Sequence, residues 1–150
     1  MRRPASMFGL SIFWASIFQV LVLSLLAHTA AKAEDGTVAF QLPSKTIGCV
    51  YSTYAGKNAL RCDIADKSAK RARHSDCEQA WGLGFEMNAN GNAARACGGD
   101  TVLDHSLPVL ATGTIWQRGG FTCRSEPTKL TCSNADQHGF SLSRAEQKVF

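Results

Sequence analysis

Apolar and polar residues alternate in several segments of the chain, with the period of two that is typical of half-buried β-strands. From residue 81 the odd positions are apolar and the even positions are small or polar: Trp81, Leu83, Phe85 and Met87 alternate with two glycines, a glutamate and an asparagine. Residues 37–42 and 139–143 alternate in the same way. With 13 glycines and frequent turn residues, the chain is predicted to be all-β, with about six to eight short antiparallel strands joined as sequential hairpins. The pattern leaves open whether they form a small barrel or a sandwich.

Two segments predict hairpins in which two cysteines lie opposite each other. Opposed residues of an antiparallel pair bring their Cβ atoms close enough for a disulfide, and alternation then places apolar residues on the cysteine face of both hairpins. The first hairpin pairs Cys49 with Cys62, with Ile47 opposite Ile64, Tyr51 opposite Leu60 and Ala55 and Gly56 at the tip. The second pairs Cys123 with Cys132, with Ser125 opposite Leu130 and Pro127 at the first central position of its turn, where the fixed φ of proline fits.

The chain has six cysteines, at positions 49, 62, 77, 97, 123 and 132. An even number in an exported chain predicts three disulfides, and once the two hairpin pairs are assigned, Cys77 and Cys97 are left for each other. The alternatives are a zinc site or a redox pair, but the chain has no C-x-x-C motif, which either of them would favour. We therefore expect no metal and no cofactor.

Turn residues divide the rest of the chain. Asn90 and Gly91 are the pair preferred in tight type I′ turns, and Gly119 and Gly120 mark a further turn before the second cysteine hairpin. Residues 65–76 contain no apolar side chain larger than alanine, so this stretch predicts an exposed loop.

The last residues predict a short C-terminal helix. Ser143 and Glu146 have the spacing of a capping box, which is typical of a helix N-terminus. In such a helix Val149 and Phe150 would pack back onto the sheet.

The first 33 residues have the pattern of a secretory signal peptide. Arg2 and Arg3 precede an apolar run, and Ala31 and Ala33 form the small-x-small pattern of a signal peptidase site. Cleavage after Ala33 predicts a signal peptide over residues 1–33 and one domain over residues 34–150, in the periplasm or secreted. The alternative is an uncleaved anchor, because the apolar run is long enough to cross a bilayer.

Removing this segment changes the charge of the chain. The formal net charge is +4, but the loss of Arg2, Arg3 and Lys32 leaves 13 of the 16 Lys and Arg residues against 12 Asp and Glu. A nucleic-acid partner requires a concentrated basic surface, and only residues 67–73 are strongly basic, in what we interpret as a solvated loop. We therefore expect no nucleic-acid partner, and a membrane partner only if the signal segment stays uncleaved.

No motif identifies a catalytic residue. His74 and His105 lie in predicted loops without a second ligand at a suitable spacing, so we interpret both as surface residues. His138 lies near two serines and Arg144, residue types that a hydrolase could use. The chain has no G-x-S-x-G sequence, however. We therefore assign no catalytic residue and keep His138 and Arg144 as possible binding residues.

Trp116 is the third possible binding residue. The large aromatic residues, Trp116 among them, fall on predicted inward faces and are first interpreted as core. An exposed Trp116 would be a plausible anchor for a protein partner or a sugar.

Several segments resemble a known family. The segments are FQLPSKTIGC from Phe40, a central WG, FTC, and LTCSNADQHGFSLSR with a terminal VF. Together they resemble an uncharacterised family of exported bacterial six-cysteine domains, a domain of unknown function, over roughly Phe40 to Phe150. Two turns depart from the family pattern: Gln137 and Lys45 stand where the pattern has glycine. The resemblance implies a bacterial source and an exported, disulfide-bonded domain, and it implies no activity.

These observations favour a binding or interaction domain of the bacterial envelope without catalytic activity, whose partner is an unknown protein or glycan. One alternative is a small hydrolase using His138 with a nearby serine or carboxylate. Another is a proteinaceous inhibitor of a cell-wall hydrolase, which rests on analogy between folds alone.

Overall fold

The computed structural model describes residues 36–65 and 81–150, which form ten strands and no helix. The strands are β1 (Gly36–Gln41), β2 (Ile47–Tyr54), β3 (Lys57–Ile64), β4 (Trp81–Asn88), β5 (Ala94–Cys97), β6 (Ile115–Arg118), β7 (Phe121–Ser125), β8 (Lys129–Ser133), β9 (Gly139–Ser143) and β10 (Gln147–Val149). This confirms the all-β prediction. The count exceeds the expected six to eight because segments of only three or four residues, β5, β6 and β10, also pair in the sheets.

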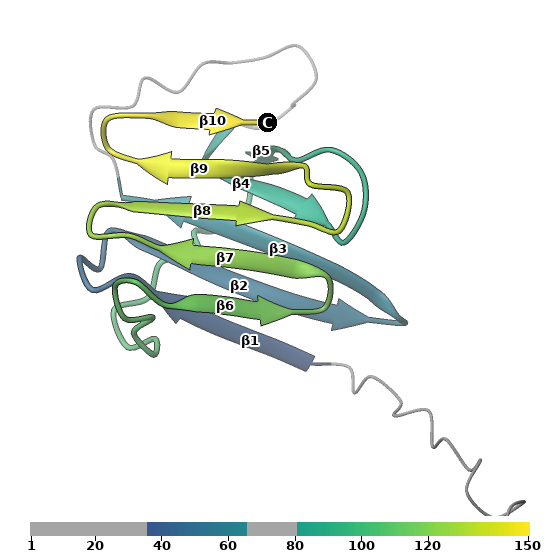
Figure 1. The fold of residues 1–150 in the computed structure, drawn as a ribbon, viewed down its shortest axis with the longest axis horizontal. Coiled ribbons are helices and arrows are strands. Elements are labelled where there is room, and N and C mark those ends of the chain that lie inside the picture. Colours follow the sequence, from purple (N-terminus) through teal and green to yellow (C-terminus); the bar gives the residue numbers. More distant parts are fainter. Residues whose placement is uncertain (1–35, 66–80) are drawn as a thin grey trace, which may run out of the picture. The chain divides into compact units, whose positions relative to one another are not determined.

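The strands form two five-stranded antiparallel sheets. Strands β1 to β5 lie side by side in sequence order in the first sheet, and β6 to β10 do so in the second. The sheets are stacked as two layers (Figure 1), and buried residues of both belong to one core cluster. The fold is therefore a sandwich and not a closed barrel.

The two cysteine hairpins have the predicted register. Cys49 lies opposite Cys62 in β2 and β3, and Cys123 lies opposite Cys132 in β7 and β8. Both pairs form disulfides, with Cα–Cα distances of 4.1 Å. Ala55 forms the tip of the first hairpin with a φ of 48° and is followed by a glycine that also has positive φ, as a type I′ turn requires.

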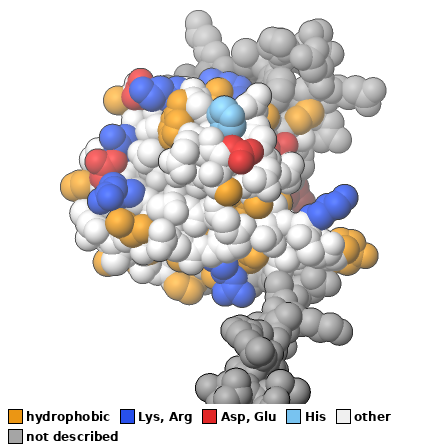
Figure 2. Space-filling view, turned by 45° about the vertical axis from the view of Figure 1, so that its right-hand side comes forward, with side chains coloured by type: hydrophobic (Ala, Val, Ile, Leu, Met, Phe, Trp, Pro, Cys, Tyr) orange, Lys and Arg blue, Asp and Glu red, His pale blue; other side chains and the backbone are white. Residues whose placement is uncertain are grey.

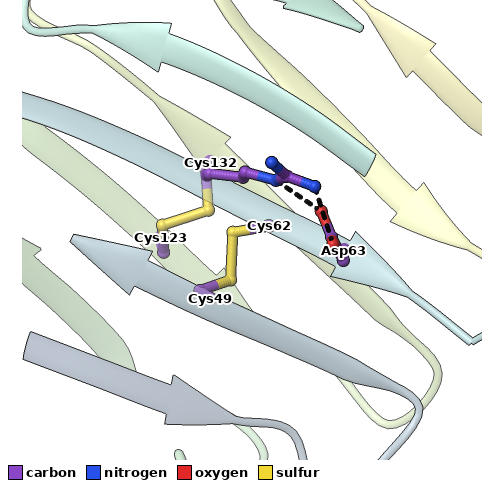
Figure 3. Close-up of a disulfide and its surroundings, with 6 residues drawn as sticks. Cys49, Cys62, Asp63, Cys123 and Cys132 are labelled. Atoms are coloured by element: carbon purple, nitrogen blue, oxygen red, sulfur yellow. Dashed lines mark hydrogen bonds and ion pairs between the residues drawn. A yellow bond between two sulfur atoms is a disulfide. The ribbon is translucent and has the colours of Figure 1, made fainter. Parts of the chain in front are cut away.

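The core lies between the two sheets. All four of these cysteines are fully buried in it, two from each sheet (Figure 3). Aromatic rings contact each other across the layers: the centroids of Phe85 and Phe140 are 5.7 Å apart, and those of Tyr51 and Phe121 are 6.1 Å apart. The predicted inward positions of Phe85, Phe121 and Phe140 are thus confirmed.

A long connection, residues 98–114, joins β5 to β6, and we call it the crossover. Its Thr101 hydroxyl and Val102 N–H both donate to the carboxylate of Asp63 in β3, each at 3.1 Å. Further along, Leu110 N–H donates to the carbonyl of Gln41 at 2.8 Å, and the Gln41 side chain donates to crossover carbonyls. The crossover therefore passes from β3 to the edge strand β1 of the first sheet. It then leads into β6, the first strand of the second sheet.

The predicted C-terminal helix is wrong. Ser143 and Glu146 close a turn in which Ser143 N–H donates to the Glu146 carbonyl at 2.8 Å, and residues 147–149 return as β10 beside β9. The Ser143 hydroxyl accepts the Glu146 N–H at 2.9 Å, so the capping contact forms within a hairpin turn. Val149 and Phe150 stay about half exposed, at 47% and 49%, instead of packing on the core.

One predicted turn also differs. Gly91 has a φ of 84°, but Asn90 does not have positive φ, so the connection between β4 and β5 is not the type I′ turn that the sequence predicted. It is a longer loop over residues 89–93.

Several predictions lie outside the described residues. They are the signal peptide over 1–33 with its cleavage site and anchor alternative, the exposed loop over 65–76 apart from Ala65, the basic segment 67–73, His74 and Cys77. Two of the three predicted disulfides are described, and Cys97, the expected partner of Cys77, is itself disulfide-bonded.

Candidate functional site

The three predicted binding residues lie in different parts of the sandwich. His138 precedes β9 and Arg144 follows it, so they lie at opposite ends of this strand. Trp116 lies in β6, where its ring is half-buried and 5.1 Å from the ring of Phe40. The structure therefore does not bring the three residues into one site, and Trp116 packs against the core.

Three turns at the Arg144 end of the sandwich surround a groove of about 440 Å³, which we call the turn groove. One turn comes from the first sheet and two come from the second, so the groove spans both layers. The lining residues are Ser44 and Thr46 between β1 and β2, Pro127 and Thr128 between β7 and β8, and Ser143, Arg144 and Ala145 between β9 and β10.

The turn of the first sheet is held by local hydrogen bonds. Leu42 N–H donates to the Ile47 carbonyl, and Lys45 N–H donates to the Leu42 carbonyl, both at 2.9 Å. Lys45 has a φ of 55°, in the left-handed region that side chains with a Cβ rarely occupy. The hydroxyls of Ser44 and Thr46 hydrogen-bond each other at 2.9 Å, so this turn presents two hydroxyl groups to the groove.

The two turns of the second sheet are closed in a similar way. Glu126 N–H donates to the Lys129 carbonyl at 2.9 Å, and Pro127 between them supplies the preset φ of a turn. In the neighbouring turn the Ser143 hydroxyl donates to the Glu146 carbonyl at 3.0 Å as well as accepting its N–H. The Ser143 hydroxyl thus both donates and accepts a hydrogen bond within the turn. Arg144 follows it as an exposed side chain.

The acidic residues of these turns are already paired. Glu126 forms an ion pair with Lys129 at 3.0 Å, and Glu146 forms one with Lys148 at 3.2 Å. Within residues 36–65 and 81–150, neither a carboxylate nor another acceptor contacts the guanidinium of Arg144. The turn groove therefore contains a cation without a counter-ion in the described part of the chain.

Hydroxyl groups add hydrogen-bond donors to the groove. The bond shared by Ser44 and Thr46 uses one of their two hydroxyl protons, and the other proton has no acceptor among the described residues. The Thr128 hydroxyl makes no hydrogen bond with any of them either. A ligand with acceptor atoms could thus bind without displacing an existing bond.

His138 lies in the loop between β8 and β9, which is organised around Asn134. This buried amide donates to the carbonyls of Asn88 and Gly91 at 3.1 and 2.7 Å, and its oxygen accepts the N–H of His138 at 3.1 Å. The loop thereby ties β9 to the end of β4. Only backbone atoms of His138 take part, and its imidazole has no hydrogen bond to a serine or a carboxylate of the described residues.

A second groove, of about 410 Å³, lies where the loops after β2 and β4 meet, and it is lined by Gly56, Lys57, Asn58, Asn88, Ala89 and Asn90. Two of its three side-chain amides, those of Asn58 and Asn90, already serve the fold. Asn58 accepts the hydroxyl proton of Tyr51 and donates to the Gly119 carbonyl, and Asn90 donates to Asp136. His138 is not among the described residues that line this groove.

Asp63 is a buried charge that the sequence did not mark as special. Its side chain is 2% exposed, and Arg61 contacts both carboxylate oxygens at 3.0 and 3.1 Å. The hydrogen bond to Asp63 raises the pKa of Arg61. Gly84 lies opposite Asp63 in β4, where a Cβ would come within 2.2 Å of the carboxylate. The pair anchors the crossover and is fully occupied by that structural role.

A family model of unknown function, DUF6636, matches residues 20–150. This chain belongs to the DUF6636 family. Comparisons of the chain with curated proteins and with solved structures found no match. The expected membership of an uncharacterised family is thus confirmed, while its sequence motifs and export are not tested by the family match.

In this DUF6636 chain, two of the segments that carried the sequence resemblance reach the turn groove. Ser44 belongs to the first segment and Arg144 to the last, about 100 residues apart in sequence. The turn residues Thr46 and Thr128 were not among the predicted site residues. Pro127 did predict its turn, but no local pattern shows that this turn lies beside two others.

The described part of the DUF6636 chain has no group of three His, Cys, Asp or Glu side chains that could hold a metal. Among the same residues there is no helix long and apolar enough to span a membrane. Figure 2 shows one face of the molecule, on which basic, acidic and hydrophobic side chains are scattered among neutral ones.

Proposed function

We propose that this chain is an exported, non-catalytic binding domain of the bacterial envelope and that the turn groove is its binding site. The observation that carries the proposal is the guanidinium of Arg144, which has no acceptor among the described residues and lies in a groove built from three turns of both sheets. Buried disulfides support export, because such bonds persist in oxidising compartments.

The imidazole of His138 has no hydrogen bond to a serine or a carboxylate among the described residues, which gives the hydrolase alternative no support. No described feature favours an inhibitor over another binding protein. Loops at one end of a rigid β-sandwich are a common place for binding residues. The turn groove has this position.

A photo-crosslinking amino acid placed in the groove tests the proposal. We expect a crosslinker at Thr128 to form a defined adduct in intact cells and one at Asn92, in the exposed loop between β4 and β5, to form none. Arg144→Gln should abolish the Thr128 adduct. Equal adducts from both positions, or none from Thr128, would contradict the assignment of the groove.

We also propose the third disulfide, Cys77 to Cys97, and cleavage after Ala33. Mass mapping of an unreduced digest should find a peptide pair joining Cys77 to Cys97, and N-terminal sequencing of the exported protein should begin at Glu34. A free thiol at Cys77 would exclude the bond, and an intact N-terminus would favour the membrane-anchored alternative.

A further inference from the structure

We infer that the turn groove recognises a carboxylate group at the end of a small peptide-like ligand. The inference rests on the proposed function and adds the chemical class of the ligand. Arg144 is the one charged residue among the described residues that line the groove. Its guanidinium is a planar fork of N–H donors that fits the two oxygens of a carboxylate.

The electrostatics of the surrounding turns favour an anion. Glu126 and Glu146, the acidic residues of the two second-sheet turns, are engaged by Lys129 and Lys148. Lys45, in the third turn, is exposed and its ammonium group has no ion pair within the described ranges. The described residues of the three turns therefore carry an excess of positive charge.

The hydroxyl groups fit the same ligand. One proton of the Ser44 and Thr46 pair and the proton of Thr128 have no acceptor within residues 36–65 and 81–150. Because a carboxylate has about four lone-pair sites, a fork from Arg144 leaves acceptor capacity for these hydroxyls. Among the lining residues that the structure describes, none has a carboxylate side chain that would repel the ligand.

The apolar lining favours a ligand with a small carbon skeleton. The Pro127 ring, the Ala145 methyl group and the threonine methyl groups line the same groove. A volume of about 440 Å³ lies within the range of small-molecule sites. In the described part of its lining, no residue is aromatic or carries a side-chain amide, so this lining offers no ring platform on which a sugar could stack. An amino-acid carboxylate with a small side chain matches this lining better than a sugar acid or inorganic phosphate.

The test uses the oxidised exported protein and a matched pair of probes, N-acetyl-L-alanine and N-acetyl-L-alaninamide, which differ only in the charged group. In NMR titrations, N-acetyl-L-alanine should shift the amide signals of Ser44, Thr128 and Ala145 in a saturable way. The amide probe should bind at least about tenfold more weakly, since a charge-assisted bidentate contact is lost.

Variants separate the guanidinium from charge in general. Arg144→Gln should weaken binding of N-acetyl-L-alanine at least about tenfold, and Arg144→Lys should give an intermediate loss because a lysine keeps the charge without the fork. Arg124→Gln is the matched control, because Arg124 is an exposed arginine of β7 that does not line the groove. It should leave binding unchanged.

The outcomes distinguish this inference from the proposed function. Equal binding of both probes, or tighter binding of glucuronate or inorganic phosphate, would overturn the peptide carboxylate. The inference would also be overturned if N-acetyl-L-alanine left the amide signals of the groove residues unshifted. If the Thr128 crosslink still formed in any of these cases, the groove would remain a binding site for another ligand. Loss of that crosslink would instead contradict the proposed function itself.

Discussion

Gln137 has a φ of 65° in the loop between β8 and β9. The left-handed conformation costs about 1–2 kcal/mol for a residue with a Cβ, and glycine does not have this cost. Part of the gain from glycine is lost because the unfolded chain becomes more flexible. The same reasoning applies to Lys45 in the turn between β1 and β2, which has a φ of 55°.

We expect Gln137→Gly to raise the free energy of unfolding by about 0.5 kcal/mol, the balance of these two effects. Chemical denaturation measures the change. Ala94→Gly is the control, because Ala94 lies in β5 without positive φ and should lose about 1 kcal/mol. A stability loss in both variants would show that the backbone at Gln137 is not strained.

The carboxylate of Asp136 accepts two hydrogen bonds from the loop between β4 and β5. The Gly91 N–H, at 2.8 Å, holds the pKa of Asp136 below its ordinary value, and the Asn90 side chain and the charge of His138 act in the same direction. A carboxylate with a lowered pKa stabilises the fold above its unfolded pKa, and this contribution disappears as the pH falls through the folded pKa.

Asp136→Asn should therefore reduce stability at pH 7 and make little difference in acid, below the lowered pKa. Denaturation curves of both proteins at pH 7 and at low pH give the comparison. A gap between the wild type and Asp136→Asn that stayed constant with pH would contradict the role of the Asp136 charge.

At the scale of the elements, the crossover depends on one buried carboxylate. Asp63 binds Arg61 on its own strand and two groups of the crossover, Thr101 and Val102. Removing one partner of a buried ion pair is costly because the other charge is left uncompensated. Arg61 is 22% exposed, so water reduces this penalty.

We expect Asp63→Asn to lower the free energy of unfolding by about 2–3 kcal/mol, below the range for fully buried pairs. Hydrogen exchange should also show faster exchange of the Val102 amide, which loses its charged acceptor. Glu126→Gln, which breaks the exposed pair with Lys129, should cost less than about 1 kcal/mol. Equal losses in the two variants would show that Asp63 does not anchor the crossover.

The elements also show what local sequence can predict. The registers around Cys49 and Cys123 could be derived because alternation and disulfide geometry act between neighbouring segments. The strand β10 could not be derived from the sequence. The hydrogen bond between the Ser143 hydroxyl and the Glu146 N–H is the same at the start of a helix and in a hairpin turn. Only the pairing of residues 147–149 with β9 distinguishes the two.

The candidate site could be predicted only in part. Arg144 was selected from its neighbourhood in the sequence, but His138 and Trp116 do not lie with it. The groove exists because turns from distant segments meet at one end of the sandwich. Their meeting depends on the path of the crossover, for which the sequence contains no periodic signal.

At the scale of the whole molecule, stability depends on the two described disulfides and on the core around them. The bonds join residues 13 and 9 positions apart in sequence, and all four cysteines are fully buried. Closing loops of this size restricts the unfolded chain and contributes about 3 kcal/mol for each bond. Burial also protects the sulfur atoms from reductants.

Replacing Cys49 and Cys62 together by alanine should lower the free energy of unfolding by about 3 kcal/mol, and replacing Cys123 and Cys132 should cost slightly less because the loop is shorter. Urea denaturation measures both. Without denaturant, the wild type treated with a mild reductant should resist thiol labelling at these four positions. Rapid labelling in native buffer would contradict their complete burial.

Each described disulfide lies within a single sheet, so neither joins the two layers. In the described part of the chain, residues 98–114 are the covalent connection between the two sheets, each of which contains its own disulfide. Proteolytic cleavage near Leu107 would therefore leave two separate peptides. They would still elute together in size-exclusion chromatography, because the apolar faces of the two sheets pack against each other. Denaturant alone, without a reducing agent, would then separate the two peptides.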